Sequence, residues 1–92
     1  MQELTQKTLP CGHIVTIEGR LKMGEFRRWM AAEKEAQYEV VYPYLAKLVK
    51  AWDWPDLDPK DPASYDELDM DEYRQVVEAV SQHIVAATAS KN

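Results

Sequence analysis

The sequence predicts an α+β domain that is mostly α-helical, with a small N-terminal β-hairpin packed on three to four helices. A β-branched run, Ile-Val-Thr-Ile at residues 14–17, follows a Pro-Cys-Gly-His turn signal. Apolar residues then recur at helical spacing within residues 22–52 and again within residues 70–87. Because 92 residues are one domain's worth of chain, we expect a single domain over residues 1–92.

Residues 3–20 are predicted to form the hairpin. The stretch from Leu4 to Leu9 mixes polar and apolar side chains, and the β-branched run supplies the second strand. Between them, Pro10 fixes φ and Gly12 accepts positive φ, which is turn chemistry. A lone hairpin is only marginally stable in water, so we expect this one to pack on the helices.

Residues 22–52 are predicted to hold two helical segments. The first carries three apolar residues at i, i+3 and i+4 spacing: Phe26, Trp29 and Met30. The second carries a longer apolar stripe and is expected to end at Trp52. Pro43 lies inside that second run and would cost about 3 kcal/mol in a helix interior. We therefore expect it near a helix start or at a kink, with the break between the helices near residues 36–42.

Residues 53–68 are predicted to be an acidic, Pro-rich connector. Its three prolines exclude a continuous helix or a central strand. Trp54 and Tyr65 are expected to anchor the connector onto the core, because an aromatic residue in such a stretch usually packs against something. Ser64 or Asp66 is expected to cap a short turn at the end of the segment.

Residues 70–87 carry the clearest helix signal. Asp69 is a good N-cap, and Glu72 follows three residues later, close to a capping box. The apolar stripe has the spacing of one helix face and consists of Tyr73, Val76, Val77, Val80 and Ile84. Residues 88–92 are small and polar, and we expect them to fray.

Composition indicates a globular chain in a reducing compartment. The chain is 46% hydrophobic and 29% charged, which is not the composition of a disordered protein. No apolar run approaches the ~20 residues of a membrane-spanning helix, and no signal-peptide pattern opens the sequence. Cys11 is the single cysteine and excludes an internal disulfide, so we expect a cytoplasmic protein with no membrane partner.

Charge is distributed unevenly along the chain. Residues 1–50 carry eight Lys/Arg and six Asp/Glu, a net charge of +2, whereas residues 51–92 carry three and ten, a net charge of −7. Nine carboxylates lie between Asp53 and Glu72, with Lys60 as the only cation among them. Such a block repels a phosphate backbone, so no nucleic-acid partner is expected. It is either a solvated connector or a surface that attracts a basic protein.

The residues that could act in catalysis or bind a metal do not form a recognisable motif in the sequence. Cys11 and His13 are two potential zinc ligands, but zinc commonly takes four, and His83 is the only other Cys or His residue. Thiol catalysis would need an oriented base and an oxyanion hole, for which the sequence gives no signal. The acidic connector lacks the turn glycine of a calcium-binding EF-hand loop. We therefore expect no enzyme activity, no cofactor and no metal.

Three aromatic residues are candidates for partner binding. Tyr42, Trp54 and Tyr65 lie off the apolar stripes or beside prolines. Trp and Tyr dominate the energetic hot spots of protein interfaces, which motivates the assignment. The alternative for each of them is ordinary packing on the core.

The order of motifs resembles a known family. Residues 9–17 read Leu-Pro-Cys-Gly-His-Ile-Val-Thr-Ile, and residues 45–52 read Leu-Ala-Lys-Leu-Val-Lys-Ala-Trp. A Pro/Asp-rich connector, a Leu68-Asp69 helix start and a last amphipathic helix follow. Over residues 9–85 this order is similar to that of the small tail assembly chaperones of long-tailed, siphovirus-like phages and prophages.

The resemblance implies a function in the cytoplasm of the infected bacterial host. Such a chaperone would bind the tape measure protein, keep its apolar helices soluble and help recruit the tail tube protein. The family carries no catalytic residues, and self-association into a homo-oligomer stays open. Proteins of this kind often occur as a short and a frameshifted long form. Lys91-Asn92 can be encoded by the slippery codons AAA AAC, which fits the short form.

Two other classes of function compete with the chaperone. The acidic block motivates a small inhibitor or DNA mimic, although a mimic should space its carboxylates along a rigid face. A structural virion component, such as a connector or tail completion protein, is the other alternative. Displacement of DNA from a basic protein would indicate the inhibitor, and presence in purified particles would indicate the virion component.

Overall fold

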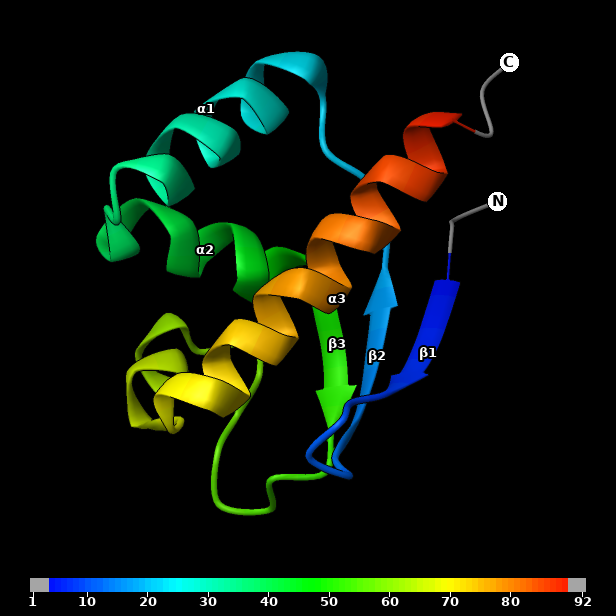
Figure 1. Ribbon diagram of the computed structural model, residues 1–92, viewed down its shortest axis with the longest axis vertical. Helices are drawn as coiled ribbons and strands as arrows, with labels where there is room; N and C mark the ends of the chain where they lie inside the picture. The colour runs from blue at the N-terminus through cyan, green and yellow to red at the C-terminus, as the bar shows by residue number, and fades with distance from the viewer. Residues whose placement is uncertain (1–3, 90–92) are drawn as a thin grey trace.

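A computed structural model describes residues 4–89 of the chain, and their side chains as far as residue 86. Seven elements follow one another: β1 (Leu4–Thr8), β2 (Ile14–Glu18), α1 (Met23–Lys34), α2 (Tyr38–Leu48), β3 (Val49–Trp52), the 3-10 helix η1 (Pro62–Glu67) and α3 (Met70–Ala89). The three strands form one antiparallel sheet in the order β1-β2-β3, with α1, α2 and η1 on one side of it (Figure 1). The predicted α+β class, helical with an N-terminal hairpin, is confirmed.

The hairpin forms where the sequence predicted it. β1 and β2 pair from Leu4–Glu18 to Thr8–Ile14. The connection is closed by two backbone hydrogen bonds, from Leu9 N to the His13 carbonyl at 2.7 Å and from Gly12 N to the Leu9 carbonyl at 2.8 Å. Gly12 has φ +99°, a left-handed conformation that favours glycine. The chain therefore reverses at the predicted Pro-Cys-Gly-His turn.

β3 corrects the predicted extent of the second helix. The expectation that this helix ends at Trp52 is wrong, because α2 ends at Leu48 and Val49 is already extended, at φ −80° and ψ 113°. Residues 49–52 pair with β2, opposite Val15 to Ile17, with a register irregularity after Thr16. A third strand covers the open edge of the hairpin, which satisfies backbone groups that a longer helix would leave unpaired.

The two predicted helices of residues 22–52 are present, and the chain breaks between them at residues 35–37. Ala36 makes the break with φ +58°. Trp29 is buried as expected, but Met30 is 54% exposed, and Ala32 takes the inward position instead. Pro43 lies in the second turn of α2, so it is inside the helix, close to its start.

The acidic connector contains one helical turn of its own. Residues 53–61 form no regular element, as the prolines of the connector predict, and η1 follows. The cap of η1 is Asp61, whose side chain accepts a hydrogen bond from Ala63 N at 3.1 Å. The expectation that Ser64 or Asp66 caps this turn is wrong: Ser64 is buried and its hydroxyl accepts from Asp58 N at 3.2 Å.

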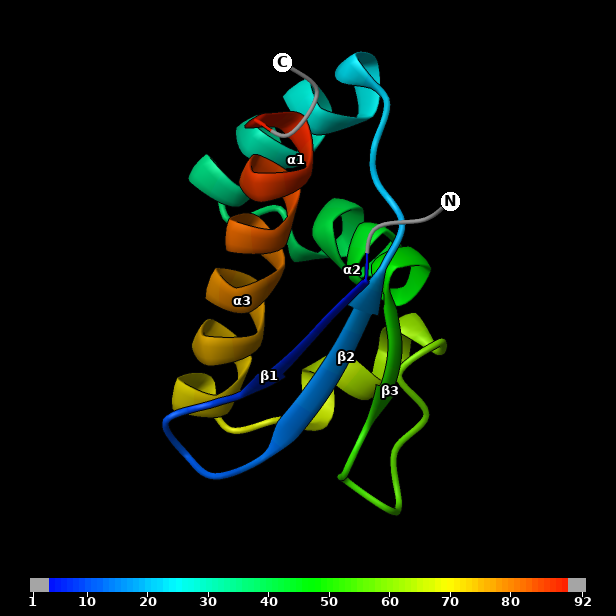
Figure 2. The same cartoon turned by 90° about the vertical axis from the view of Figure 1, so that its right-hand side faces the viewer.

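α3 runs past the sheet and closes the core (Figure 2). Its predicted stripe faces inward, with Val76, Val80 and Ile84 buried and Tyr73 and Val77 partly buried. At its start, Asp69 N donates to the Glu72 carboxylate at 3.3 Å, one half of the predicted capping box. The helix extends to Ala89, so residues 88 and 89 are helical, while the rest of the predicted frayed tail, residues 90–92, lies outside the described residues.

The core gathers apolar side chains from β2, β3, the three α-helices and η1. Its largest fully buried members are Trp29, Tyr65, Ile17, Leu45 and Leu48. Among the described residues, none of the helices is long and apolar enough to cross a membrane.

Candidate functional site

A tyrosine-lined groove opens between α1, α2, η1 and α3. Its volume is about 580 Å³. Four tyrosines contribute to its lining, and we call them the groove tyrosines: Tyr38, Tyr42, Tyr65 and Tyr73. Apolar walls from Val41, Leu68, Met70 and Val77 complete it, with Glu33, Asp66 and Arg74 as its charged residues. An open hollow with apolar walls and a few polar groups is the usual form of a binding site.

The groove tyrosines form a continuous aromatic cluster. Tyr73 is packed edge-on against both Tyr38 and Tyr42, with centroids 5.7 Å apart in each pair. Tyr38 and Tyr42 are stacked at 6.1 Å, one helical turn apart on α2, and Tyr42 lies 6.0 Å from Tyr65. Edge-on and offset contacts of this kind are the favoured aromatic geometries. The rings therefore form a firm surface from which Tyr38, 49% exposed, projects.

Burial raises the pKa values of several side chains that line the groove. Desolvation, with a hydrogen bond that the Tyr42 hydroxyl donates to Asp66 at 3.0 Å, raises the pKa of Tyr42 to about 12. Burial raises the pKa of Tyr65 and Tyr73 still further above the usual range. Desolvation also raises the pKa of the Glu33 carboxyl, although the residue as a whole is exposed. Desolvation therefore favours the neutral form of each of these four groups.

These pKa shifts predict that the domain loses stability in alkali. An unfolded tyrosine ionises near pH 10, but Tyr42 keeps its proton in the fold until about pH 12. The folded state therefore holds more protons between these values, and the free energy of unfolding falls as pH rises through this window. Tyrosinate absorbance, titrated in native buffer and in denaturant, should show part of the signal delayed in the native sample only. The Tyr42→Phe variant should lose the component near pH 12, and identical native and denatured curves would contradict the prediction.

The structure separates the three predicted partner-binding residues. Tyr42 is half-buried and lines the groove. Tyr65 is only 1% exposed, so it is a core residue, as the packing alternative describes, and it contributes to the lining of the groove from within the core. Trp54 is half-buried and lies elsewhere, stacked on His13 with centroids 4.0 Å apart. Trp52 connects the two regions, at 5.1 Å from both Trp54 and Tyr65.

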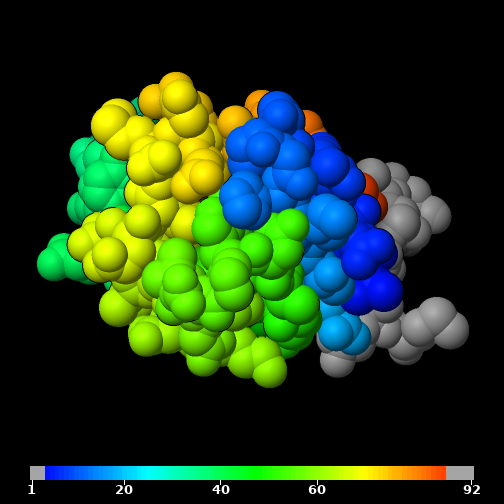
Figure 3. All heavy atoms as spheres, turned by 90° about the horizontal axis from the view of Figure 1, so that it is seen from below, coloured from blue at the N-terminus to red at the C-terminus, as the bar shows by residue number. Residues whose placement is uncertain are grey.

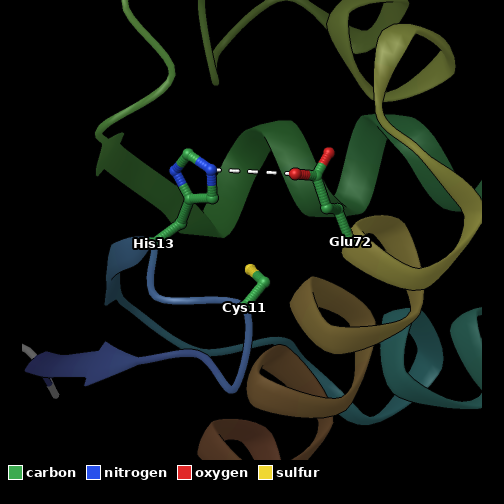
Figure 4. Close-up of side chains that lie close together, drawn as sticks. All are labelled: Cys11, His13 and Glu72. Carbon is green, nitrogen blue, oxygen red and sulfur yellow. Dashed lines mark ion pairs between the residues drawn. The ribbon is translucent and has the colours of Figure 1, made fainter.

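A second cluster lies at the tip of the hairpin. Seen from below, the turn meets the segment after β3 and the start of α3 on one face (Figure 3). His13 Nδ1 is 2.6 Å from Asp53 Oδ1, and His13 Nε2 is 3.7 Å from Glu72 Oε2. Cys11 Sγ joins them, so that ligand atoms of Cys11, His13 and Glu72 all lie within 4.8 Å of one another (Figure 4). The hydrogen bond to His13 lowers the pKa of Asp53.

Sequence reasoning missed residues that complete the tyrosine-lined groove and the cluster at the hairpin tip. Tyr38 and Tyr42 are i and i+4 in one helix, which is a signal for a shared face, but the break near residues 36–42 obscured it. The sequence indicates only a helix-start role for Glu72, whose carboxylate is one of many in an acidic region. Nothing in its sequence context distinguishes it as a neighbour of Cys11 and His13.

No family model matches the chain, and neither a curated protein nor a solved structure matches it. The fold and its two clusters therefore define the protein as a small α+β domain with an aromatic groove, and its function is inferred from that geometry.

Proposed function

We propose that this chain is a tail assembly chaperone that binds a helical segment of the tape measure protein in its tyrosine groove. It would act by protein–protein contact in the cytoplasm of the infected bacterial host and assist assembly of the tail tube protein. The observation that carries the proposal is the groove itself, an open apolar hollow of about 580 Å³ faced with tyrosines. The order of sequence motifs adds the resemblance to the chaperone family.

The rim of the groove suits an apolar helix. Tyr38 is 49% exposed and Met70 is 77% exposed, so both keep apolar surface free for a partner. Tyrosine supplies a large contact area at low entropic cost, and methionine adapts to partners of different shape. An amphipathic helix that lays its apolar face into such a groove is a recurring mode of peptide recognition.

The charged residues of the groove indicate which kind of client helix it would bind. Glu33 and Asp66 lie in the lining, and partial desolvation raises the pKa of the Glu33 carboxyl. A lysine or arginine of the client beside Glu33 would supply the missing counter-charge. Arg74, on the α3 side of the groove, would pair with one acidic side chain of the client. The proposed client segment is therefore apolar on one face and carries basic residues along the edge of that face.

Binding of tape measure peptides tests the proposal. Helical segments of the tape measure protein encoded beside this chain would be titrated calorimetrically against it. The Tyr38→Ala/Met70→Ala double variant should bind at least about tenfold more weakly, because truncation of two hot-spot side chains removes more than about 1.4 kcal/mol. The matched control is Tyr44→Ala/Met23→Ala, whose tyrosine and methionine lie on α2 and α1 but do not line the groove.

Two results would overturn the proposal. One is equal weakening by both double variants, which would place the contact outside the groove. The other is a complete lack of binding by the unaltered chain. In that case, displacement of DNA from a basic protein would favour the inhibitor class, and presence of the chain in purified particles would favour a virion component.

A further inference from the structure

The cluster at the hairpin tip has three side chains of metal-ligand type. Cys11 and His13 project from the turn, and Glu72 projects from the first turn of α3, with ligand atoms within 4.8 Å of one another (Figure 4). Tetrahedral zinc with bonds of about 2.0–2.3 Å to N, O and S sets its ligands about 3.3–3.6 Å apart. The Nε2–Oε2 separation of 3.7 Å is already close to that spacing. Cys11 is exposed, so its short side chain is free to make the remaining approach.

The orientation of His13 prepares one ring nitrogen as a ligand. Asp53 Oδ1 accepts a hydrogen bond from Nδ1–H at 2.6 Å, and Trp54 stacks on the ring at 4.0 Å. Nε2, the other ring nitrogen, faces the Glu72 carboxylate at 3.7 Å. A carboxylate behind a histidine is the usual second shell of a metal-bound imidazole, since it fixes the tautomer and the ring position.

The facing atoms of His13 and Glu72 can bind one cation together. Nε2 and Oε2 are 3.7 Å apart, and a metal ion bound between them would displace any proton on Nε2. The neighbouring Cys11 thiol adds a soft ligand to this pair. The mixed S, N and O set is typical of zinc.

The backbone holds the turn at α3 independently of any ion. Cys11 N donates to the Gln75 side chain at 2.9 Å, one turn of α3 beyond Glu72. Gly12 allows the tight reversal that sets Cys11 and His13 on the same side. The site is therefore largely built before a ligand arrives.

We propose that Cys11, His13 and Glu72 bind one Zn²⁺ per chain, with Asp53 orienting His13 and the fourth position open. An open position takes water or a side chain of a bound partner. The ion would fasten the hairpin tip to the start of α3, and the proposal is independent of the tyrosine groove. The thiol loses its proton to solvent on binding.

Cobalt substitution tests the site with the reduced chain and no client present. One Co²⁺ per chain should bind with tetrahedral d–d bands and a thiolate charge-transfer band, and Zn²⁺ should displace it. Cys11→Ser should abolish the thiolate band, and Glu72→Gln should weaken binding at least about tenfold. Asp53→Asn should weaken it about 10- to 100-fold through the orientation of His13. Glu78→Gln, an exposed glutamate further along α3, is the matched control and should leave affinity unchanged.

A second readout guards against misfolded variants. Zinc should raise the thermal unfolding midpoint of the unaltered chain and of Glu78→Gln but not of Glu72→Gln. Three results would overturn the proposal: no thiolate band, equal affinity of Glu72→Gln and Glu78→Gln, or half a metal ion per chain. The last would mean that cysteines of two chains share the ion.

Discussion

Replacement of Tyr65 by alanine should destabilise the domain by about 4 kcal/mol, the scale expected for truncation of a fully buried aromatic side chain. Tyr65 is 1% exposed and stands edge-on to Trp52 with centroids 5.1 Å apart. It packs the connector onto the core, so its truncation leaves a cavity between η1 and the rest of the core. Because small domains are stable by only about 5–15 kcal/mol, the variant should be close to unfolding at ambient temperature.

The Tyr65→Phe variant separates the ring from the hydroxyl. The hydroxyl donates to the Pro59 carbonyl at 2.6 Å, and removal of that bond alone should cost about 1 kcal/mol. Urea unfolding followed by tryptophan fluorescence would measure both variants. A loss for Tyr65→Ala as small as that for Tyr65→Phe would mean that burial of the ring does not hold the connector in place.

The elements predicted correctly are those whose signal is local. The stripe of α3 repeats at helical spacing and carries its own start signal at Asp69, so neither depends on distant residues. The hairpin likewise rests on a turn glycine and a β-branched run within a few positions. Such patterns are contained in the neighbouring residues, which is why sequence reasoning reaches them.

β3 could not be predicted because its conformation is decided by a distant partner. Val49 and Trp52 continue the helical spacing of α2, and a short apolar run does not distinguish helix from strand. Pairing with β2 fixes the extended form, and that pairing joins segments far apart in the chain. The same applies to Tyr65, whose burial depends on the fold of η1 against α2.

The candidate sites likewise combine residues with a local sequence signal and residues that only the fold brings together. The turn that carries Cys11 and His13 was predicted, whereas Glu72 joins them only because α3 starts beside the hairpin tip. Tyr42 is a predicted partner-binding residue that lines the groove, yet its neighbour Tyr73 lies on α3 and meets it only in the fold. Local chemistry was visible in the sequence, and long-range juxtaposition was not.

His83 is the second position at which we expect a large loss of stability. Its side chain is 3% exposed and joins three segments of the chain. Nε2 donates to the Gly19 carbonyl at 2.7 Å, and Nδ1 is hydrogen-bonded to the Thr5 hydroxyl, also at 2.7 Å. His83 is therefore a buried structural residue that ties α3 to β1 and to the loop after β2, remote from the ligand set of Cys11.

The His83→Leu variant should lose about 3 kcal/mol of unfolding free energy. Leucine fills much of the space but leaves the Gly19 carbonyl and the Thr5 hydroxyl without their partner, and a buried polar group left unpaired costs about 1–3 kcal/mol. The Thr5→Val variant, which removes one of the two bonds, should lose about 1 kcal/mol. The double variant should lose less unfolding free energy than the sum of the two single-variant losses, because the Thr5–His83 bond can be removed only once. Strict additivity, or a loss for His83→Leu no larger than that of the adjacent exposed Gln82→Ala, would mean that this buried network does not hold α3 against the hairpin.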